Sequence, residues 1–331
     1  MKRLLVALVT VAALSVAAVA QADTTKVEGV PQFGNVFVII GENTDYSQVT
    51  AKDSPYLINT VKPESAWLTN YWATTHYSES NYVAMTSGQF TACEQADGSI
   101  ADCHQDVPNL FNQLDQTSGP GAWTSWMESM PSACDVNSFG SDSALNKYRA
   151  KHNPALVYDD VAGSWSNGVL TPSTECNTQD IPAGTTGPNN MDALNNALDS
   201  GSVSRFNYIV PNECEDAHDN CKPVGNPQLQ FDNFLSREVP EILNSPAFGS
   251  DGVLIITYDE ADTKSPNHAD KFGNGGQVVN AVISPLANVG SYGNEWNHYS
   301  LLRTLQDGLG TSGIEYLGNA AFVSPINTIW K

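Results

Sequence analysis

Four short apolar runs in the sequence predict buried β-strands, at residues 35–40, 206–210, 253–258 and 278–283. The first run is continuously apolar from Val36, and each of the others contains one polar residue, a composition typical of strands covered on both faces of a parallel sheet. Helical patterns lie between them, at residues 55–61, 81–87, 231–243 and 298–309. Because strands alternate with helices, the pattern predicts an α/β fold with helices on both faces of a sheet. Pro240 predicts a kink or a break in the third helix, since proline cannot donate the helical hydrogen bond.

Residues 88–200 differ from the rest of the chain. They contain four of the six cysteines and many Gly, Ser, Asn and Asp residues, with few strong periodic runs. This composition favours loops and short helices. We interpret the segment as a cap-like insertion into a single domain that spans residues 23–331.

The first 22 residues have the pattern of a secretory signal peptide. Lys2 and Arg3 precede an apolar stretch over residues 4–19, and Ala20-Gln21-Ala22 provides a small-x-small cleavage site. An uncleaved membrane anchor is the alternative, but the apolar stretch is short and ends cleanly at the alanines. The sequence therefore predicts a secreted or periplasmic protein.

The cysteines agree with export. An even number of cysteines in an exported chain is typical of disulfides, and proximity along the chain suggests the pairs Cys93–Cys103, Cys134–Cys176 and Cys214–Cys221. A thiolate metal site is the alternative, and no Cys-x-x-Cys motif supports it.

The charge of the chain excludes some classes of partner. Fifteen Lys and Arg residues against 36 Asp and Glu residues give a formal net charge of −21. A protein that binds nucleic acid or an anionic membrane through a broad basic face would not have this balance. An anionic substrate is still compatible with it, because a bound cation can invert the local field. The only long apolar run is at the N-terminus, so we expect no stable membrane insertion.

Acidic residues follow two of the predicted strands directly. Glu42 and Asn43 come after residues 35–40, and Asp259 and Glu260 come directly after residues 253–258. Ligand sites in α/β sheets lie beyond the carboxyl ends of the strands. Two groups of carboxylates meeting there would repel each other without a cation or a shared proton, and oxygen ligands suit a divalent metal ion. Alternatively, each acid caps a following helix.

A serine-rich segment precedes the predicted helix at 81–87. Its hydroxyl groups, on Ser78 and Ser80, would lie at the positive end of the helix dipole, which favours an anionic substrate and lowers the pKa of an attacking alkoxide. The alternative is that one of these serines is only an N-cap.

The six histidines are few enough for their positions to be informative. His218 and Asp216 follow the strand at 206–210, and His298 opens the last predicted helix. His152 lies in the segment Lys151-His152-Asn153-Pro154, and His268 follows the acids at 259–260. Histidines beside strand-end acids favour acid–base catalysis or metal binding. His104, which lies near a cysteine, is interpreted as a surface residue.

Several of these segments, in this order, resemble the phosphoesterase family of secreted acid phosphatases and bacterial phospholipases C, related to the alkaline phosphatase superfamily. The resemblance extends from about residue 35 to the C-terminus. The segments are Ile39-Ile40-Gly41-Glu42-Asn43, Thr75-His76-Tyr77-Ser78-Glu79-Ser80-Asn81-Tyr82, Lys151-His152-Asn153-Pro154, Pro211-Asn212 with Asp216-Ala217-His218-Asp219, Thr257-Tyr258-Asp259-Glu260 and Asn297-His298-Tyr299-Ser300-Leu301-Leu302-Arg303.

This resemblance implies a three-layer α/β/α sandwich of the alkaline phosphatase type and hydrolysis of phosphate esters through a phosphoserine. It implies a divalent metal ion, of unspecified identity, bound by Glu42, Asn43, Ser78, Asp259 and Glu260. It also implies that Asn81 hydrogen-bonds the phosphoryl oxygens, and that four further residues supply acid–base or phosphate-binding groups, with Asp219 supporting them. These four are His152, Asp216, His218 and His298.

The nucleophile segment departs from the family pattern His-Pro-Ser-x-Pro-Asn-Tyr, because Tyr77 and Ser80 replace the two prolines. Ser80 thereby becomes a rival nucleophile. We favour Ser78, since its spacing to Asn81 is the spacing of the family.

The resulting functional hypothesis is a secreted acid phosphatase that acts on small phosphate monoesters, such as a sugar phosphate, a nucleotide or a phospholipid headgroup. The first alternative is a phosphodiesterase of the phospholipase C type. The second is an exported ligand-binding protein without catalytic activity, which would use Trp123, Trp126 and Trp165 as stacking surfaces.

Overall fold

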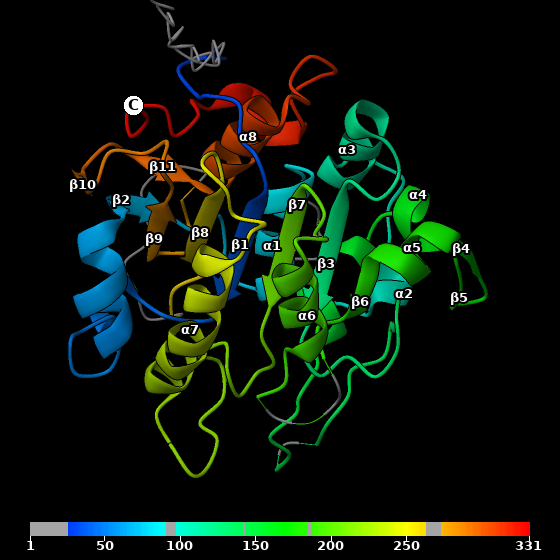
Figure 1. Ribbon diagram of the computed structural model, residues 1–331. Coiled ribbons are helices and arrows are strands. Elements are labelled where there is room, and N and C mark those ends of the chain that lie inside the picture. Colours follow the sequence, from blue (N-terminus) through cyan, green and yellow to red (C-terminus); the bar gives the residue numbers. More distant parts are fainter. Residues whose placement is uncertain (1–25, 91–96, 142, 185–186, 188, 263–272) are drawn as a thin grey trace, which may run out of the picture.

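The computed structural model describes residues 26–90, 97–141, 143–184, 187, 189–262 and 273–331. The signal peptide predicted over residues 1–22, together with Cys93 and His268, lies outside these described residues. A nine-stranded sheet forms the centre of the fold (Figure 1). Its strands, in spatial order, are β10 (Gly290–Tyr292), β2 (Ala66–Trp72), β9 (Gln277–Ile283), β8 (Val253–Tyr258), β1 (Val36–Gly41), β7 (Phe206–Val210), β3 (Trp123–Met127) and β6 (Asp180–Pro182), and β11 (Trp296–Asn297) pairs with β2.

All four predicted strands are confirmed, as β1, β7, β8 and β9. Strand β1 lies in the middle, and it pairs in parallel with β8 on one side and with β7 on the other. Every residue of β1, β7 and β8 is buried, as their largely apolar sequences predict. Strand β9 is antiparallel to both β8 and β2, so the sheet is mixed.

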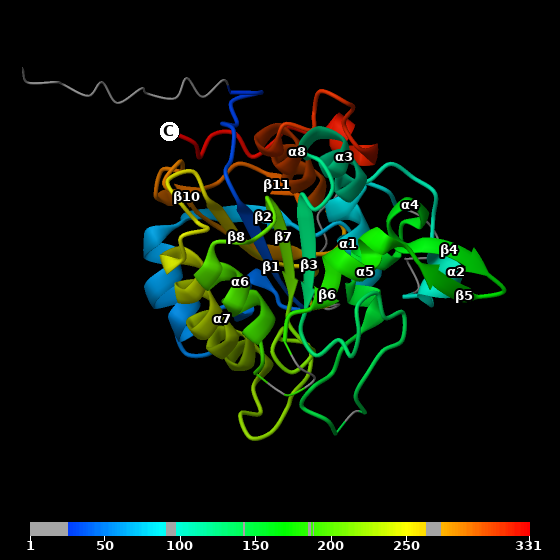
Figure 2. The same ribbon diagram turned by 45° about the vertical axis from the view of Figure 1, so that its right-hand side comes forward.

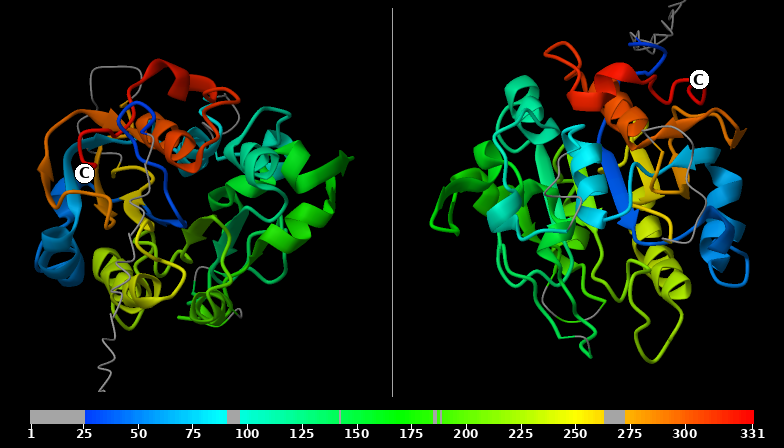
Figure 3. Two further views of the ribbon diagram at one scale, coloured as in Figure 1. Left: turned by 45° about the horizontal axis from the view of Figure 1, so that its top comes forward. Right: turned by 180° about the vertical axis from the view of Figure 1, so that it is seen from behind.

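Helices cover both faces of the sheet. Helices α6 (Asp192–Ser200) and α7 (Pro227–Asn244) pack together on one face, and α1 (Ser78–Thr86) packs against α8 (His298–Leu309) on the opposite face (Figures 1 and 3). The predicted three-layer α/β/α architecture is therefore confirmed. The expected helix at 298–309 has the predicted bounds, whereas α1 begins at Ser78, before the predicted start at residue 81.

The break expected at Pro240 is absent, since α7 continues through this residue to Asn244. Val239 and Ile242 are buried on either side of the proline, and the side chain of Asn244 donates a 2.8 Å hydrogen bond to the carbonyl of Pro240. Burial of the apolar face thus holds the last turn in spite of the missing N–H group.

The segment 88–200, which was expected to form a cap-like insertion, contributes two strands to the central sheet. Strands β3 and β6 belong to the central sheet, and β3 pairs in parallel with β7. Strand β3 was not predicted, because two polar residues interrupt the apolar pattern of its sequence, Trp-Thr-Ser-Trp-Met. All five side chains are nevertheless buried. The rest of the segment forms short elements at one end of the molecule (Figure 2). They are α2 (Ile100–Cys103), α3 (Leu110–Ser118), α4 (Asp159–Ala162), α5 (Thr174–Gln179) and the hairpin of β4 (Gly163–Ser166) and β5 (Val169–Pro172).

Short helical turns complete the described fold. The expected helix at 55–61 is a single turn of π-helix, η2 (Leu57–Val61). The others are 3₁₀ turns: η1 (Tyr46–Gln48), η3 (Lys62–Glu64), η5 (Ala150–His152), η6 (Pro154–Leu156) and η7 (Gly318–Phe322). None of the helices in the described part of the chain is long and apolar enough to cross a bilayer.

Two predicted disulfides, Cys134–Cys176 and Cys214–Cys221, are present. The first closes a loop of 42 residues within the 88–200 segment, and the second closes a loop of seven residues beyond β7. The third predicted pair includes Cys93, which is not among the described residues.

Candidate active site

The acidic residues that follow β1 and β8 meet at one edge of the sheet. These strands are paired up to Gly41 and Tyr258, so Glu42 and Asp259 leave adjacent strand ends. The backbone N–H of Asn43 donates to Oδ1 of Asp259 at 3.2 Å. Both carboxyl groups are fully buried. Parallel pairing thus brings together two acidic groups that are more than 200 residues apart in the sequence.

The first turn of α1 holds the carboxylate of Glu42. Ser78 Oγ donates to Glu42 Oε2 at 2.8 Å, and the Tyr82 hydroxyl donates to Oε1 at 2.6 Å. Residues four apart lie on the same face of a helix, so both hydroxyl groups point to Glu42. Ser80 faces elsewhere, and its buried Oγ has no hydrogen-bond partner among the described residues. Of the two serines, only Ser78 joins the acidic cluster.

Strained turns flank the site residues. Asn43, Tyr77 and Ala217 have positive φ angles of 43°, 93° and 83°, a region that costs a residue other than glycine about 1–3 kcal/mol. Tyr77 immediately precedes Ser78, and Ala217 lies between Asp216 and His218. The surrounding packing therefore holds these turns in conformations that aim the neighbouring side chains at a common point.

His152 and Asp216 complete the buried cluster. His152 Nε2 lies 3.5 Å from Glu42 Oε1, and its Nδ1 lies 3.8 Å from Asp216 Oδ2. The imidazole stacks on the Tyr82 ring, with 5.3 Å between centroids and an angle of 10°. Burial, with the nearby charge of Lys151, lowers the pKa of His152 well below its usual value. His152 is therefore a neutral imidazole in this structure.

His218 has the opposite charge state. Its Nδ1 lies 2.8 Å from Asp219 Oδ1, and its backbone N–H donates to Asp216 Oδ1 at 2.8 Å. Burial lowers the pKa of His218, but the hydrogen bond to Asp219 and the negative charge of Asp216 and Glu213 outweigh burial and raise it to about 9. The ring is half-buried, 6.2 Å from that of His152, and it is a cation over the neutral pH range.

Glu213, His218 and Asp219 also place their ligand atoms within 4.8 Å of one another, a spacing that could hold a metal ion. Each carboxylate already has a basic partner, however. Arg149 lies 2.7 Å from Glu213, and Lys147 contacts Asp219. The cluster is thus balanced in charge without a metal.

The carboxyl groups around Ser78 are not balanced in this way. Burial, together with the charges of Asp259 and Asp216, raises the pKa of Glu42 well above its usual value. Burial and the charge of Glu260 raise the pKa of Asp259 to about 7. Three buried atoms have no hydrogen-bond partner among the described residues, namely Asp259 Oδ2, Asp216 Oδ2 and His152 Nε2. Unpartnered oxygens and mutually repelling carboxylates are what a divalent cation would satisfy, so Glu42, Asp259 and Ser78 fit a metal site.

Three predicted site residues have their polar atoms engaged elsewhere. The Asn81 amide makes four hydrogen bonds, all to backbone atoms of Thr74, Thr75 and Tyr77. Asn81 therefore shapes the turn before Ser78, and no donor is left for a phosphoryl oxygen in this structure. Glu260 accepts from the backbone N–H of Tyr77 and lies 2.8 Å from His76 Nδ1.

His298 is also engaged on both sides. Its Nδ1 lies 2.9 Å from the Tyr71 hydroxyl, and its Nε2 lies 2.5 Å from the backbone oxygen of Asp259. Burial lowers the pKa of His298 to about 4. The ring therefore holds the strand end that carries Asp259, and its contacts do not direct it towards Ser78.

A cavity of about 400 Å³ opens above Ser78. Its lining consists of Asn43, His76, Tyr77, Ser78, Asp97, Lys151 and Glu260. Sequence reasoning missed Lys151 and Asp97 as lining residues. The sequence does point to Lys151, because it precedes His152 in the segment Lys151-His152-Asn153-Pro154, which resembles the phosphoesterase family. Asp97 has no sequence signal, because only the fold brings it to the cavity.

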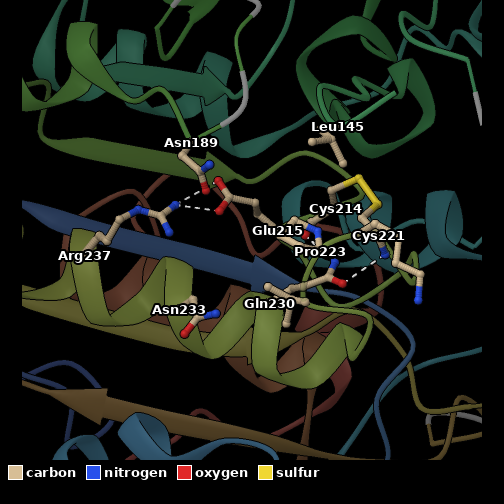
Figure 4. A pocket seen from close by; sticks show the side chains of 11 residues that line it. Leu145, Asn189, Cys214, Glu215, Cys221, Pro223, Gln230, Asn233 and Arg237 are labelled. Carbon is tan, nitrogen blue, oxygen red and sulfur yellow. Dashed lines mark hydrogen bonds and ion pairs between the residues drawn. A yellow bond between two sulfur atoms is a disulfide. The ribbon is translucent and has the colours of Figure 1, made fainter. Parts of the chain in front are cut away.

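A second cavity, of about 130 Å³, lies beside the Cys214–Cys221 disulfide (Figure 4). Arg237 and Glu215 are joined by an ion pair of 2.7 Å at its wall. The cavity is lined by none of the predicted site residues, although Glu215 directly precedes Asp216. Glu215 thus lines this cavity, whereas the adjacent Asp216 belongs to the buried cluster around Glu42.

The tryptophans considered as stacking surfaces do not form one. Trp123 and Trp126 are buried within β3, and the half-buried Trp165 stacks on His104 at 4.7 Å. The alternative of a ligand-binding protein with a tryptophan platform therefore loses its structural basis.

The fold has many solved counterparts. A protein of the alkaline phosphatase superfamily from Vibrio parahaemolyticus superposes with a TM-score of 0.53 at 12% identity, covering 86% of this chain and 68% of that one. This similarity shows that the fold is the alkaline phosphatase type.

Sequence relatives are phosphatases. A probable acid phosphatase from Kluyveromyces lactis is 28% identical over 70% of this chain and 48% of its own length. The chain thus spans about half of that relative. A phosphatidylinositol-3-phosphatase from Mycobacterium tuberculosis is 25% identical over 91% of this chain and 84% of its own. A family model described as the phosphoesterase family matches residues 43–310, which include nearly all of the site, and the chain belongs to this phosphoesterase family.

Proposed function

We propose that the protein is an exported phosphomonoesterase of the acid phosphatase type that forms a phosphoserine at Ser78. The hydrogen bond of 2.8 Å from Ser78 to Glu42 is the observation that carries the proposal, because it joins a helix-start hydroxyl to the buried acidic cluster. Membership of the phosphoesterase family and relatives named as phosphatases support the reaction class.

In this proposal Glu42, Asn43, Ser78, Asp259 and Glu260 hold a divalent metal ion. When bound, the ion withdraws charge from the phosphoryl group and favours the alkoxide form of Ser78. Glu42 and Asp259 are the residues best placed for this role, because their carboxyl groups are buried against each other. Glu260 takes part by releasing its contacts with His76 and the backbone of Tyr77.

The remaining residues handle the substrate and the protons. Ser78 Oγ, as the alkoxide that is left when its proton is released to solvent, attacks phosphorus, the bond to the ester oxygen breaks, and His218, a cation at neutral pH, protonates the departing oxygen. Water then attacks the phosphoserine and gives a proton back to His218, and inorganic phosphate and the Ser78 alkoxide are released. Neutral His152 lies between Glu42 and Asp216, and from this side of Glu42 the two residues orient the attacking groups. Asn81 and His298 are positioning residues, since the former fixes the turn before Ser78 and the latter fixes the strand end at Asp259.

An acidic pH optimum follows from the net charge. At −21 the molecule repels a dianionic phosphate ester, and this repulsion decreases as carboxylates and phosphate take up protons. Export is supported by the N-terminal signal pattern and by the two disulfides, which persist in oxidising compartments.

Phosphate release tests the proposal. The full mature chain is incubated with p-nitrophenyl phosphate and with p-nitrophenylphosphorylcholine at pH 5 and pH 7, before and after chelation, beside Ser78→Ala. We expect hydrolysis of the monoester, faster at pH 5, dependent on metal and absent in the variant. Preferential cleavage of the choline diester would identify a phospholipase C activity instead, and no release from either ester would reject a phosphoesterase function.

A further inference from the structure

The cavity above Ser78 contains few groups that can attract a phosphate. Among the described residues that line it, Glu260 and Asp97 are acidic and only His76 and Lys151 are basic. His76 is paired with Glu260 at 2.8 Å. Lys151 is therefore the flexible cation that faces the place where the substrate of the proposed reaction would bind.

Lys151 is a cation in this setting. Burial lowers the pKa of its ammonium group, but the hydrogen bond and the charge of Asp97, with the more distant charges of Glu42 and Asp259, outweigh burial and raise it. The Lys151 side chain is about one quarter exposed, and it lines the cavity. It can therefore exchange one anionic partner for another without moving through the protein interior.

The Asp97 carboxylate pairs with the Lys151 ammonium group and at the same time accepts a hydrogen bond from a backbone N–H. Its Oδ2 lies 2.8 Å from Lys151 Nζ, and its Oδ1 accepts a 3.1 Å hydrogen bond from the backbone N–H of Glu79. Glu79 is the second residue of α1, so its N–H is one of the helix-start donors that have no acceptor within the helix, and it lies next to Ser78. A lysine and a helix N-terminal N–H are the donors that phosphoryl oxygens commonly take in proteins.

A second feature lies in the buried cluster that Ser78, one of the lining residues, contacts through Glu42. Asp259 Oδ2, Asp216 Oδ2 and His152 Nε2 are buried and make no hydrogen bond within the described residues. They surround Glu42, which Ser78 contacts directly. Asp97 and Lys151 therefore line a cavity that borders, through Ser78, a buried cluster with unsatisfied polar atoms.

We propose that Lys151 binds the transferring phosphoryl group and that the carboxylate of Asp97 is an intramolecular competitor, which occupies Lys151 and the Glu79 N–H until the phosphate displaces it. This inference rests on the proposed function and adds a residue pair that sets the affinity for a phosphate dianion. The backbone of Asp97 has a φ of 46°, a conformation that asparagine tolerates as well as aspartate, so Asp97→Asn removes the charge without straining the turn.

Inorganic phosphate is the probe, because its binding requires no turnover. Affinity is measured by titration calorimetry at pH 6 on the full mature chain, and as inhibition of p-nitrophenyl phosphate hydrolysis. The proteins are wild type, Asp97→Asn, Lys151→Gln and the double variant. Asp199→Asn on the exposed surface of α6 and Lys222→Gln in the cavity of Figure 4 are matched controls that remove the same charges far from Ser78.

We expect Asp97→Asn to tighten phosphate binding about three- to tenfold and Lys151→Gln to weaken it about tenfold, with no change in the two controls. Competition predicts that the effect of Asp97→Asn is lost when Lys151 is already Gln. If Asp97→Asn tightens phosphate binding equally when Lys151 is already Gln, Asp97 acts only by repelling phosphate. This result would overturn the competitor role. Weaker binding in Asp97→Asn would overturn it too, since Asp97 would then be holding Lys151 for the substrate.

Two further measurements separate a failure of the proposed function, or a folding defect, from a failure of the Lys151 proposal. If the wild type binds phosphate but hydrolyses no monoester, the proposed function fails while the calorimetry still decides the role of Lys151. If Lys151→Gln does not fold, as judged by its circular dichroism, Lys151→Arg replaces it. Arginine keeps the charge, so we expect affinity within about threefold of the wild type, and a tenfold loss in a folded Lys151→Arg would reject charge-based binding.

Discussion

Ser78 and Glu42 are joined by a 2.8 Å hydrogen bond although they belong to different layers of the fold. Glu42 follows the central strand β1, and Ser78 begins helix α1, which covers one face of the sheet. Asp259, at the end of the adjacent strand β8, lies against the same pair. The candidate centre is therefore a meeting point of two strand ends and one helix start.

The identity of the nucleophile is the first testable prediction. We expect Ser78→Ala to reduce kcat for p-nitrophenyl phosphate by about three decades or more, because the covalent step is lost. Ser80→Ala is the matched control, since it removes a buried hydroxyl without a described partner and should leave kcat within about threefold. Circular dichroism checks the fold of both variants. Full activity in Ser78→Ala, with a loss in Ser80→Ala, would make Ser80 the nucleophile.

The metal site gives a prediction on stability. In the presence of a chelator, Glu42→Gln should unfold at the same temperature as the wild type or higher, because the substitution removes one of several buried carboxyl groups that repel each other. Added Mg²⁺, Mn²⁺, Zn²⁺ or Ca²⁺, tried one by one, should raise the melting temperature of the wild type for at least one ion, and should not raise that of Glu42→Gln.

Glu64→Gln serves as the control for this experiment, because Glu64 is exposed and distant from the strand ends. Its response to each metal should match that of the wild type. An equal metal-dependent rise in Glu42→Gln would place the cation elsewhere, and the Glu213, His218 and Asp219 cluster would be the next site to test.

The role of His218 can be separated from binding by varying the leaving group. Its pKa of about 9 keeps it protonated at the pH of the assay, as a general acid requires. We expect His218→Gln to lower kcat for an alkyl phosphate about 100-fold or more and to affect p-nitrophenyl phosphate much less, since nitrophenolate departs without a proton. His104→Gln, remote from Ser78, is the control. Equal losses for both esters would assign His218 to phosphate binding.

His298 should make the unfolding free energy depend on pH. Its pKa is about 4 in the folded protein and about 6.5 when unfolded, so the unfolded state binds a proton first as the pH falls. This contribution to stability is complete above pH 6.5 and is lost progressively towards pH 4. The loss amounts to about 2 kcal/mol at pH 5.

Urea unfolding of the wild type and of His298→Gln at pH 7 and pH 5 measures this effect. We expect the variant to be less stable at pH 7 by about 2–4 kcal/mol, because the Tyr71 hydroxyl and the Asp259 carbonyl lose their partner. The difference should shrink at pH 5. A difference that is constant or larger at pH 5 would mean that the folded protein holds His298 in its charged form.

Much of the fold was predictable because its central strands are buried on both faces. The largely apolar sequences of β1, β7 and β8 predict their position in the middle of a sheet. Strand β3 escaped prediction, since Thr124 and Ser125 interrupt its pattern and their burial depends on neighbours from other segments. Helix α7 was predicted to break at Pro240, and tertiary packing of its apolar face overrides that local preference.

For the candidate site, the sequence by itself determined which residues stand at the strand ends and the helix start, because the apolar pattern that marks each element and the chemistry of each side chain are local properties. Only the tertiary structure decided how each side chain is used. It turned Ser78 rather than Ser80 towards Glu42, engaged Asn81 and His298 with the backbone, and brought Asp97 to Lys151. Hydrogen bonds of this kind depend on directions and distances between residues far apart in the chain, which no local pattern of residues specifies.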